Sequence, residues 1–263
     1  LGDVYKRQGR ERFGKKRAQV RGKVCTDEFD WTGENRTYIP LKQMIVYQCH
    51  VRGFTKHESS KVKHPGTFSG VTEKIPYLKE LGINTLFMMP VYDFNEQMTD
   101  ETGSLLNKIN YWGYTRDAFY FSPKASYGSG NKPVVTEFKE MVCSLHSQGM
   151  NFILDMYFEG KSPEFITRCL RYYAQEYHVD GFHVTSDKMD LEWLRQDPVL
   201  AYCKIFGDGY QADSQGMYME MNDGFMINAR RFLKSDEGQT EGFYHYFKQQ
   251  RQDGENLHYI TQH

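Results

Sequence analysis

The sequence predicts an α/β protein built from strand–helix–strand units. Two observations carry this prediction: short, nearly continuous apolar runs recur along the chain, and amphipathic segments of helical length separate them. Continuous apolar strands are typical of parallel sheets covered on both faces, and each parallel pair needs a long crossover connection, which is usually a helix. The class is therefore α/β, with its strands paired in parallel.

The first regular elements follow Pro40, which closes a polar, turn-rich segment. The apolar run at 44–51 predicts the first strand, the pattern over 68–81 predicts a helix, and 83–91 predicts the second strand. A long loop is expected from there to the next helix, at 135–148.

The middle of the chain continues the alternation. The run at 150–158 predicts the third strand, and a helix is expected over 163–177. Gly181 marks the turn into the fourth strand, at 181–185, and a short helical piece is expected near Leu191.

The last third of the chain predicts three more strands. They lie at 202–207, 216–221 and 257–261, and a helix is expected over 225–234. Seven strands in all are therefore predicted.

Composition narrows the possible partners. The formal net charge of −1 gives no electrostatic footprint for nucleic acid, and no apolar stretch is long enough to cross a bilayer. The N-terminus also lacks the basic-then-apolar pattern of a secretion signal. We therefore expect a neutral partner, no nucleic acid and no membrane; the sequence does not indicate an oligomeric state.

The cysteines argue against a disulfide framework and against a zinc site. They are odd in number, far apart and in no C-x-x-C pair: Cys25, Cys49, Cys143, Cys169 and Cys203. No calcium-binding loop of the Asp-x-Asp-x-Asp-Gly kind is present either. We expect no metal and no cofactor, and a reducing, cytoplasmic location.

Several motifs closely resemble glycoside hydrolase family 13, the α-amylase superfamily, in its branch of isoamylases, pullulanases and glycogen-debranching enzymes. The most specific block is "VRGFT" at 51–55 with "HPGTFSG" at 64–70. The likeness continues through "NYWGY" at 110–114, the segment 137–156 and "NDGFMINARRFLKSD" at 222–236.

The resemblance implies a (β/α)8 TIM-type barrel at 41–263, with an α-glucan cleft at the carboxyl ends of the strands. Because an eighth strand is needed to close such a barrel, we expect the sequence to be truncated before the last strand. Residues 9–40 are expected to be a remnant of an N-terminal β-sandwich and a linker, and residues 1–8 a non-native leader.

The family cleaves α-1,6 or α-1,4 glucosidic bonds with retention, using a nucleophilic Asp and an acid/base Glu. Such a pair of carboxylates lies about 5–5.5 Å apart. The family's fourth-strand motif is Gly-Phe-Arg-x-Asp, and this chain has GFHVT at 181–185. Thr185 therefore stands at the nucleophile position and His183 at that of the supporting Arg. A threonine hydroxyl is not ionised at neutral pH and cannot replace a carboxylate.

Other catalytic positions depart from the motifs too. Asp208 aligns with the acid/base Glu but is one methylene shorter, and His263 is a candidate for the His after the seventh strand. Asp187 is a possible substitute nucleophile if the fourth strand stays extended, because His183, Thr185 and Asp187 would then share one face. Alternatively, Asp187 caps the next helix.

The resemblance also implies substrate contacts. Tyr114 matches the tyrosine that stacks on the first-subsite sugar, and Asp155 keeps the Asp of the third-strand motif, which has lost its His. Glu159 is an added carboxylate that is either in the cleft or in a solvated loop. His50 ends the first strand and either faces the cleft or has a structural role.

Three functions stay open at this point. The first is a debranching-type barrel that has lost hydrolytic competence and at most binds α-glucan. The second is an active retaining hydrolase or transglycosylase with a rearranged pair, such as Asp187 with Asp208. The third is a scaffolding or regulatory domain that binds a protein at the barrel mouth.

Overall fold

A parallel sheet of seven strands organises the protein, which we describe from a computed structural model. The structure describes residues 28–99, 104–188, 194, 196–207, 218–253 and 256–259. The chain divides into two units, Leu1–Asp30 and Trp31–His263, and the sheet belongs to the second. In order across the sheet, the strands are β1 (Val46–Cys49), β2 (Thr85–Met88), β7 (Asn151–Tyr157), β8 (Gly181–Thr185), β9 (Lys204–Gly207), β10 (Tyr218–Asn222) and β11 (Asn256–His258).

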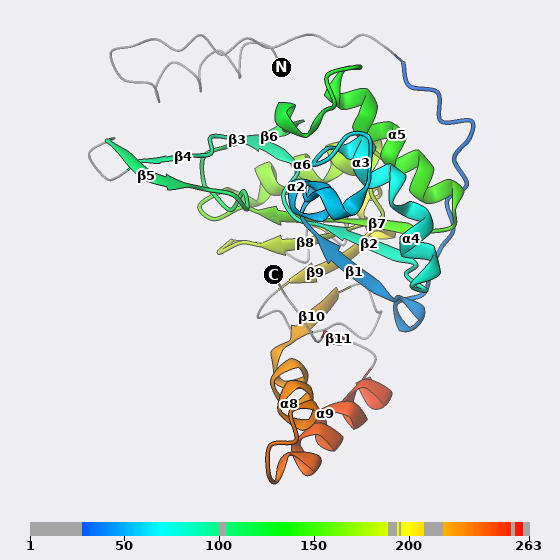
Figure 1. Cartoon of the computed structure of the whole chain (residues 1–263), viewed down its shortest axis with the longest axis vertical. Coiled ribbons are helices and arrows are strands. Elements are labelled where there is room, and N and C mark those ends of the chain that lie inside the picture. The colour runs from blue at the N-terminus through cyan, green and yellow to red at the C-terminus, as the bar shows by residue number, and fades with distance from the viewer. Residues whose placement is uncertain are drawn as a thin grey trace. The chain divides into compact units, whose positions relative to one another are not determined.

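Each strand pairs in parallel with the next, so the carboxyl ends of all seven meet at one edge of the sheet (Figure 1). The predicted α/β class and parallel pairing are confirmed, since each predicted strand overlaps one of these seven. The fourth predicted strand has the same bounds as β8.

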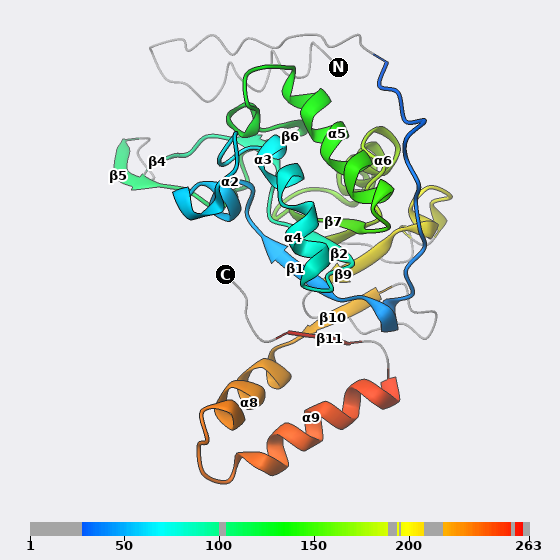
Figure 2. The ribbon, with the colours of Figure 1, turned by 45° about the vertical axis from the view of Figure 1, so that its right-hand side comes forward.

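Helices cover the sheet along the chain. They are α2 (Val51–Thr55), α3 (Phe68–Glu73), α4 (Ile75–Glu80), α5 (Val134–Ser147), α6 (Pro163–Glu176), α8 (Asp223–Leu233) and α9 (Gln239–Asp253). Short 3₁₀ turns occur at Leu41–Gln43, Glu58–Ser60, Ala125–Tyr127 and Leu200–Tyr202. Figures 1 and 2 show α3, α4 and α5 along one side of the sheet, and α8 beside α9 next to β10 and β11.

The single helix expected at 68–81 is a wrong prediction, because two helices occupy this segment. The chain breaks at Lys74, between α3 and α4, where the Lys74 N–H donates to the Val71 carbonyl instead of continuing the α-helical ladder. Pro76 explains the break: it has no N–H to donate to the preceding turn, and its ring is tolerated only in the first turn of a new helix.

The long loop expected between the second strand and α5 contains four short strands. They form two antiparallel pairs, β3 (Tyr92–Phe94) with β6 (Ala118–Pro123) and β4 (Gln97–Thr99) with β5 (Leu105–Ile109). The helices α2 and α9 are further elements that the sequence reading did not anticipate. The helical piece expected near Leu191 lies outside the described residues.

The two faces of the sheet bury different side chains, as strand alternation requires. On the helical side, Phe138 and Tyr173 from the helices pack with Phe152 of β7 in the larger core. On the opposite face, Phe87 of β2, Ile153 of β7 and Phe206 of β9 form a smaller apolar cluster. We call the face opposite the helices the inner face of the sheet. On β7 this face carries Ile153, with Asn151 before it and Asp155 after it.

Ion pairs hold the segment before β1 against the amino-terminal edge of the sheet. Glu34 and Arg36 supply the charged groups from this segment. Glu34 contacts two histidines: its carboxylate lies 2.5 Å from His146 Nδ1 and 2.6 Å from His178 Nδ1. His146 is fully buried, and its Nε2 lies 2.8 Å from Asp180 Oδ2. Both ring nitrogens of His146 therefore face a carboxylate.

Asp180 completes this network just before β8. Its carboxylate also accepts hydrogen bonds from the Arg36 guanidinium at 3.0 Å and from the Phe152 N–H at 2.8 Å. Burial alone would raise the pKa of Asp180, but the hydrogen bond and charge of His146, together with Arg36 and the Phe152 N–H, hold it below its ordinary value.

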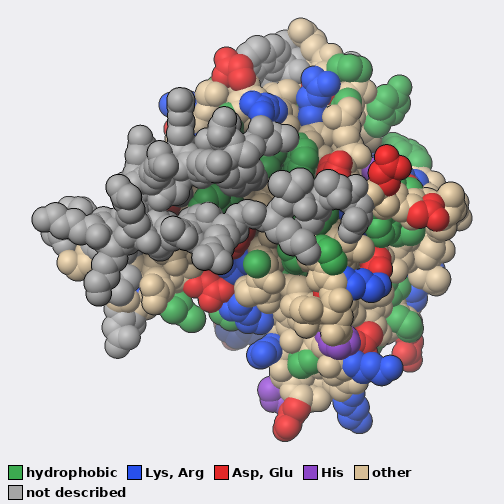
Figure 3. Space-filling view, turned by 90° about the horizontal axis from the view of Figure 1, so that it is seen from above, with side chains coloured by type: hydrophobic (Ala, Val, Ile, Leu, Met, Phe, Trp, Pro, Cys, Tyr) green, Lys and Arg blue, Asp and Glu red, His purple; other side chains and the backbone are tan. Residues whose placement is uncertain are grey.

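Along the described part of the chain, no helix is long and apolar enough to cross a membrane. On the face shown in Figure 3, acidic and basic side chains are interspersed over the visible described surface, in keeping with a net charge of −1.

We expect Gly181→Ala to destabilise the protein by about 1–3 kcal/mol through overpacking. A Cβ at this position would lie 2.6 Å from the backbone oxygen of Lys204 on the neighbouring strand. Gly33→Ala is the control, since no atom lies within 4 Å of its added Cβ. Urea unfolding measures both, and equal free energies of unfolding for the two variants would contradict the packing argument.

Asp180 should make stability sensitive to acid. Because its folded pKa is depressed, its contribution is present above the unfolded pKa of about 3.9 and is lost as the pH falls through the folded pKa. We expect Asp180→Asn to cost about 3 kcal/mol at pH near 7 and the difference from wild type to shrink below pH of about 4. Urea unfolding at several pH values checks this, with the exposed Asp236→Asn as control; a difference that does not vary with pH would overturn it.

Candidate functional site

A hydrogen-bonded group of three side chains lies toward the carboxyl ends of β7 and β8. Asp155 of β7, only 2% exposed, is the register partner of His183 on β8. Its Oδ1 lies 3.0 Å from His183 Nδ1, and its Oδ2 accepts a hydrogen bond of 2.5 Å from the Tyr114 hydroxyl. Three residues that the sequence reading predicted as separate substrate contacts are thus brought together around one buried carboxylate.

Tyr114 reaches Asp155 because the loop before it is tightly folded. Asn110 bridges this loop, accepting from the Gly113 N–H at 3.0 Å and donating to the Tyr114 carbonyl at 3.1 Å. Gly113 has φ +93°, and a Cβ there would lie 2.8 Å from the Phe94 ring. Glycine is therefore required at this position. The fold of the "NYWGY" segment positions the Tyr114 side chain at Asp155.

His183 is buried between a charged and an apolar neighbour. Its Nδ1 carries the proton that Asp155 accepts, which fixes the orientation of the ring. The ring lies 5.6 Å from that of Phe87 on β2, at the top of the apolar cluster of the inner face.

Thr185 is the last residue of β8, with its register partner Tyr157 on β7. Its side chain is half-buried, and its carbonyl accepts a hydrogen bond of 2.7 Å from the Phe158 N–H. The position that the sequence resemblance assigns to the nucleophile therefore lies at the strand end, and the residue there carries a neutral hydroxyl.

Asp187 does not continue the strand, so the condition under which His183, Thr185 and Asp187 would share one extended face is not met. The strand ends at Thr185, and Asp187 is exposed. Its carboxylate accepts a 2.8 Å hydrogen bond from the Gly160 N–H in the loop after β7, which lowers its pKa. This contact joins the two loops that follow β7 and β8.

Glu159 is held by two neighbours. Its carboxylate pairs with the Arg116 guanidinium and accepts a hydrogen bond from the Tyr157 hydroxyl. The sequence analysis does not identify Arg116 or Tyr157. Arg116 is 43 residues from Glu159, so no local motif pairs them, whereas Tyr157 is only two residues away.

His50 follows β1 and caps α2. Its Nδ1 accepts from the Gly53 N–H at 3.1 Å, so its Nε2 carries the proton and donates to the Tyr127 hydroxyl at 2.8 Å. The rings of Tyr111 and Trp112 lie 4.6 and 5.6 Å from the imidazole. These contacts agree with the structural alternative for His50.

Asp208 and His263 lie outside the described residues. Among the residues that the structure does describe, no group of three or more His, Cys, Asp or Glu side chains is placed to hold a metal ion. The polar site described at the strand ends thus consists of hydrogen-bonding and ion-paired side chains.

The described residues form a parallel α/β fold with polar side chains at the carboxyl ends of its strands. Residues 48–222 match the family model of the alpha-amylase catalytic domain. The chain belongs to the alpha-amylase family, whose catalytic domain implies a (β/α)8 barrel; the seven described strands are a partial form of it.

Curated relatives are debranching-type proteins. The chain is 30% identical to isoamylase 1, chloroplastic, of Oryza sativa subsp. japonica, with 82% of this chain and 38% of the relative covered. It is 26% identical to the glycogen debranching enzyme of Erwinia tasmaniensis, with 92% and 48% covered. The chain therefore spans less than half the length of these relatives.

Solved structures share the fold. A pullulanase from Anoxybacillus sp. LM18-11, complexed with maltotetraose, has a TM-score of 0.68 at 20% identity, covering 86% of this chain and 45% of that one. A pullulanase from Bacillus subtilis complexed with maltose has a TM-score of 0.62 at 23% identity, covering 82% and 40%.

We expect Asp155→Asn to destabilise the protein by about 1–3 kcal/mol, because an amide cannot accept from both Tyr114 and His183 without turning a donor toward one of them. Tyr114→Phe should be partly redundant with it, giving a coupling energy of about 1 kcal/mol in a double-mutant cycle. Urea unfolding provides all four values, with the exposed Glu80→Gln as control. Strict additivity would show that the hydroxyl and the carboxylate do not act together.

Proposed function

We propose that this chain is a debranching-type member of the alpha-amylase family that binds α-glucan at the carboxyl ends of its strands and is catalytically impaired. The single observation that carries the proposal is Thr185 at the end of β8. Retaining hydrolysis needs one ionised carboxylate to attack the anomeric carbon and a second, protonated one to release the leaving oxygen. A threonine hydroxyl without an adjacent base supplies neither.

The carboxylates described around Thr185 support the impairment because each is engaged elsewhere. Asp155 accepts from Tyr114 and His183, and Glu159 pairs with Arg116. Asp187 is exposed and tied to the Gly160 N–H beyond the strand end. A rearranged nucleophile at Asp187 would have to leave this contact, and Asp208 remains a prediction for the acid/base position.

The glucan ligand is supported by the family and by the kind of side chains at the strand ends. The pullulanase neighbours are complexes with malto-oligosaccharides, and relatives are named as glycogen debranching enzymes. Tyr114 provides an aromatic ring beside a buried carboxylate, and such a ring suits the apolar face of a sugar.

The finer organisation belongs to the same proposal. We propose that residues 41–263 belong to the barrel and that residues 9–40 derive from an N-terminal β-sandwich and linker. A cytoplasmic location likewise remains a prediction, and the plant relatives carry chloroplastic names.

The proposal predicts that the protein releases no reducing sugar from pullulan or glycogen above background, since losing an activated nucleophile costs on the order of 10⁴-fold or more in kcat. It also predicts retardation in native gels that contain glycogen. The variant His183→Arg with Thr185→Asp, with or without Asp208→Glu, should gain hydrolysis or tighter glucan binding.

Control variants test the catalytic impairment and the glucan binding separately. Thr185→Ala should behave like the parent in both assays, whereas Tyr114→Ala should weaken glycogen binding by roughly tenfold. Turnover by the parent that Asp208→Asn or Asp187→Asn abolishes would overturn the impairment. Absence of gel retardation in a protein shown to be folded would overturn glucan binding and favour a scaffolding role.

A further inference from the structure

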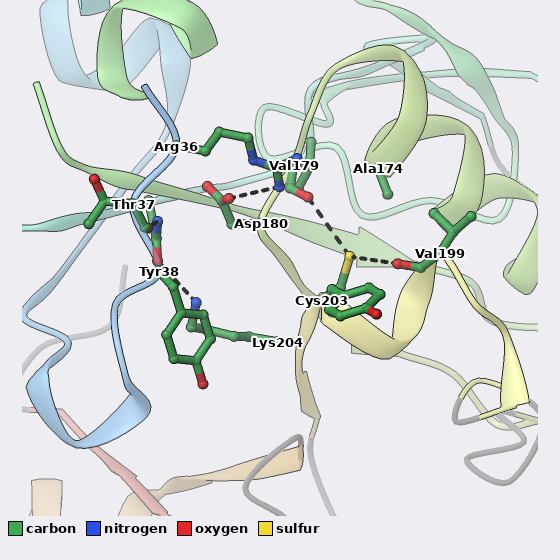
Figure 4. A pocket seen from close by; sticks show the side chains of 11 residues that line it. Arg36, Thr37, Tyr38, Ala174, Val179, Asp180, Val199, Cys203 and Lys204 are labelled. Atoms are coloured by element: carbon green, nitrogen blue, oxygen red, sulfur yellow. Dashed lines mark hydrogen bonds and ion pairs between the residues drawn. The ribbon is translucent and has the colours of Figure 1, made fainter. Parts of the chain in front are cut away.

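A pocket of about 370 Å³ opens at the amino-terminal ends of β7, β8 and β9, at the opposite edge of the sheet from Thr185 (Figure 4). The proposed glucan site does not use it. The charged and polar side chains that line it are Arg36, Thr37, Asn151, Asp180 and Lys204, with Tyr38 and Tyr202. Its size falls within the range of small-molecule sites, about 300–1,000 Å³.

The pocket holds two cations with unused hydrogen-bond donors. Arg36 donates from one guanidinium nitrogen to Asp180, and Lys204 donates to the Asn151 side-chain oxygen at 3.0 Å. An arginine has five N–H donors and a lysine three, so both residues have donors left over. Figure 4 shows the Arg36 and Lys204 side chains on either side of Asp180.

The carboxylate and the amide that line the pocket are already hydrogen-bonded within the protein. Asp180 Oδ1 accepts from Arg36, and its Oδ2 accepts from His146 and from the Phe152 N–H. The Asn151 amide donates to the Thr37 carbonyl while its oxygen accepts from Lys204. The pocket therefore offers donors and positive charge, and an acceptor-rich anion complements it.

Lys204 is the desolvated cation of this pocket. Lys204 is 6% exposed. Burial lowers the pKa of its ammonium, and the charge of Arg36 acts weakly in the same direction. The nearby Asp180 opposes that shift but is itself compensated by His146. A bound anion beside Lys204 would favour the charged form of its ammonium, because an opposite charge offsets part of the cost of burial.

Two exposed aromatic rings add a second kind of contact. Tyr38 is 75% exposed and Tyr202 is 86% exposed, although both line the pocket. The Lys204 ammonium lies 4.9 Å from the centroid of the Tyr38 ring, so this ring stands directly beside the buried cation. Large exposed rings next to a polar pocket suit a ligand that has an apolar ring face as well as a charged group.

We propose that this pocket binds a sugar phosphate, with the phosphate on the donors of Arg36 and Lys204 that Asp180 and Asn151 do not use, and the sugar ring against Tyr38 and Tyr202. A phosphate monoester carries about −1.5 to −2 charges at neutral pH and three strong acceptor oxygens, which match the surplus donors. The site is separate from the glucan site and does not depend on the function proposed there.

Isothermal titration of the whole chain with glucose 6-phosphate tests the proposal, at constant ionic strength held with sodium chloride. Binding is expected with a dissociation constant below about 1 mM. Arg36→Gln and Lys204→Met should each weaken it by roughly tenfold to a hundredfold, the loss of one charge-assisted contact. Lys132→Met, which removes an exposed cation paired with Glu140, is the matched control and should leave affinity unchanged.

Inorganic phosphate and glucose are the comparison ligands. Phosphate should bind more weakly than the ester because it lacks the ring, and Tyr38→Ala should bring the two to similar affinities. The proposal is overturned if glucose 6-phosphate does not bind, if neither cation variant weakens binding, or if phosphate alone binds as tightly as the ester. Because Arg36 is half-exposed, its variant remains informative even if Lys204→Met fails to fold.

Discussion

The parallel pairing of β7 with β8 is the constraint on which the rest of the structure depends. It sets Asp155 beside His183 and Tyr157 beside Thr185, and it brings Asp180 within reach of the Phe152 N–H at the other end. Between the two ends, Ile153 packs with Phe87 and Phe206 in an apolar layer. This apolar layer lies between the proposed glucan site and the amino-terminal pocket. The buried charges at each end of the strands are therefore paired with neighbours at that same end.

The elements that the sequence predicted well are those whose signal is local. Buried parallel strands are continuous apolar runs, so β7 and β8 stand out from their neighbours. The pairs β3 with β6 and β4 with β5 were missed because strands of three to six residues depend on a partner elsewhere in the chain. The break at Lys74, in contrast, has a local cause in the sequence, because Pro76 cannot donate to the preceding turn.

The candidate site also combines features that the sequence predicts with features that only the folded chain shows. The resemblance assigned Tyr114, Asp155 and His183 individually, yet only the folded chain shows that all three meet at one carboxylate. The amino-terminal pocket could not be predicted, because Arg36, Asn151, Asp180 and Lys204 come from four separate segments with no shared motif. Spacing along a sequence indicates partners on one element, whereas a pocket between elements depends on register and loop paths.

The two departures at positions 183 and 185 make physical sense as a pair. The family motif, as the resemblance implies it, places an Arg and an Asp there, a cation and a carboxylate that compensate each other. With Thr185 in place of the Asp, an arginine at 183 would bring five donors into a buried site where Asp155 already accepts from Tyr114. His183 avoids this cost with one N–H to Asp155 and a ring against Phe87. A carboxylate at position 185 alone would add a second negative charge to the strand ends that already hold Asp155, with no added cation, so the proposed variant changes both positions.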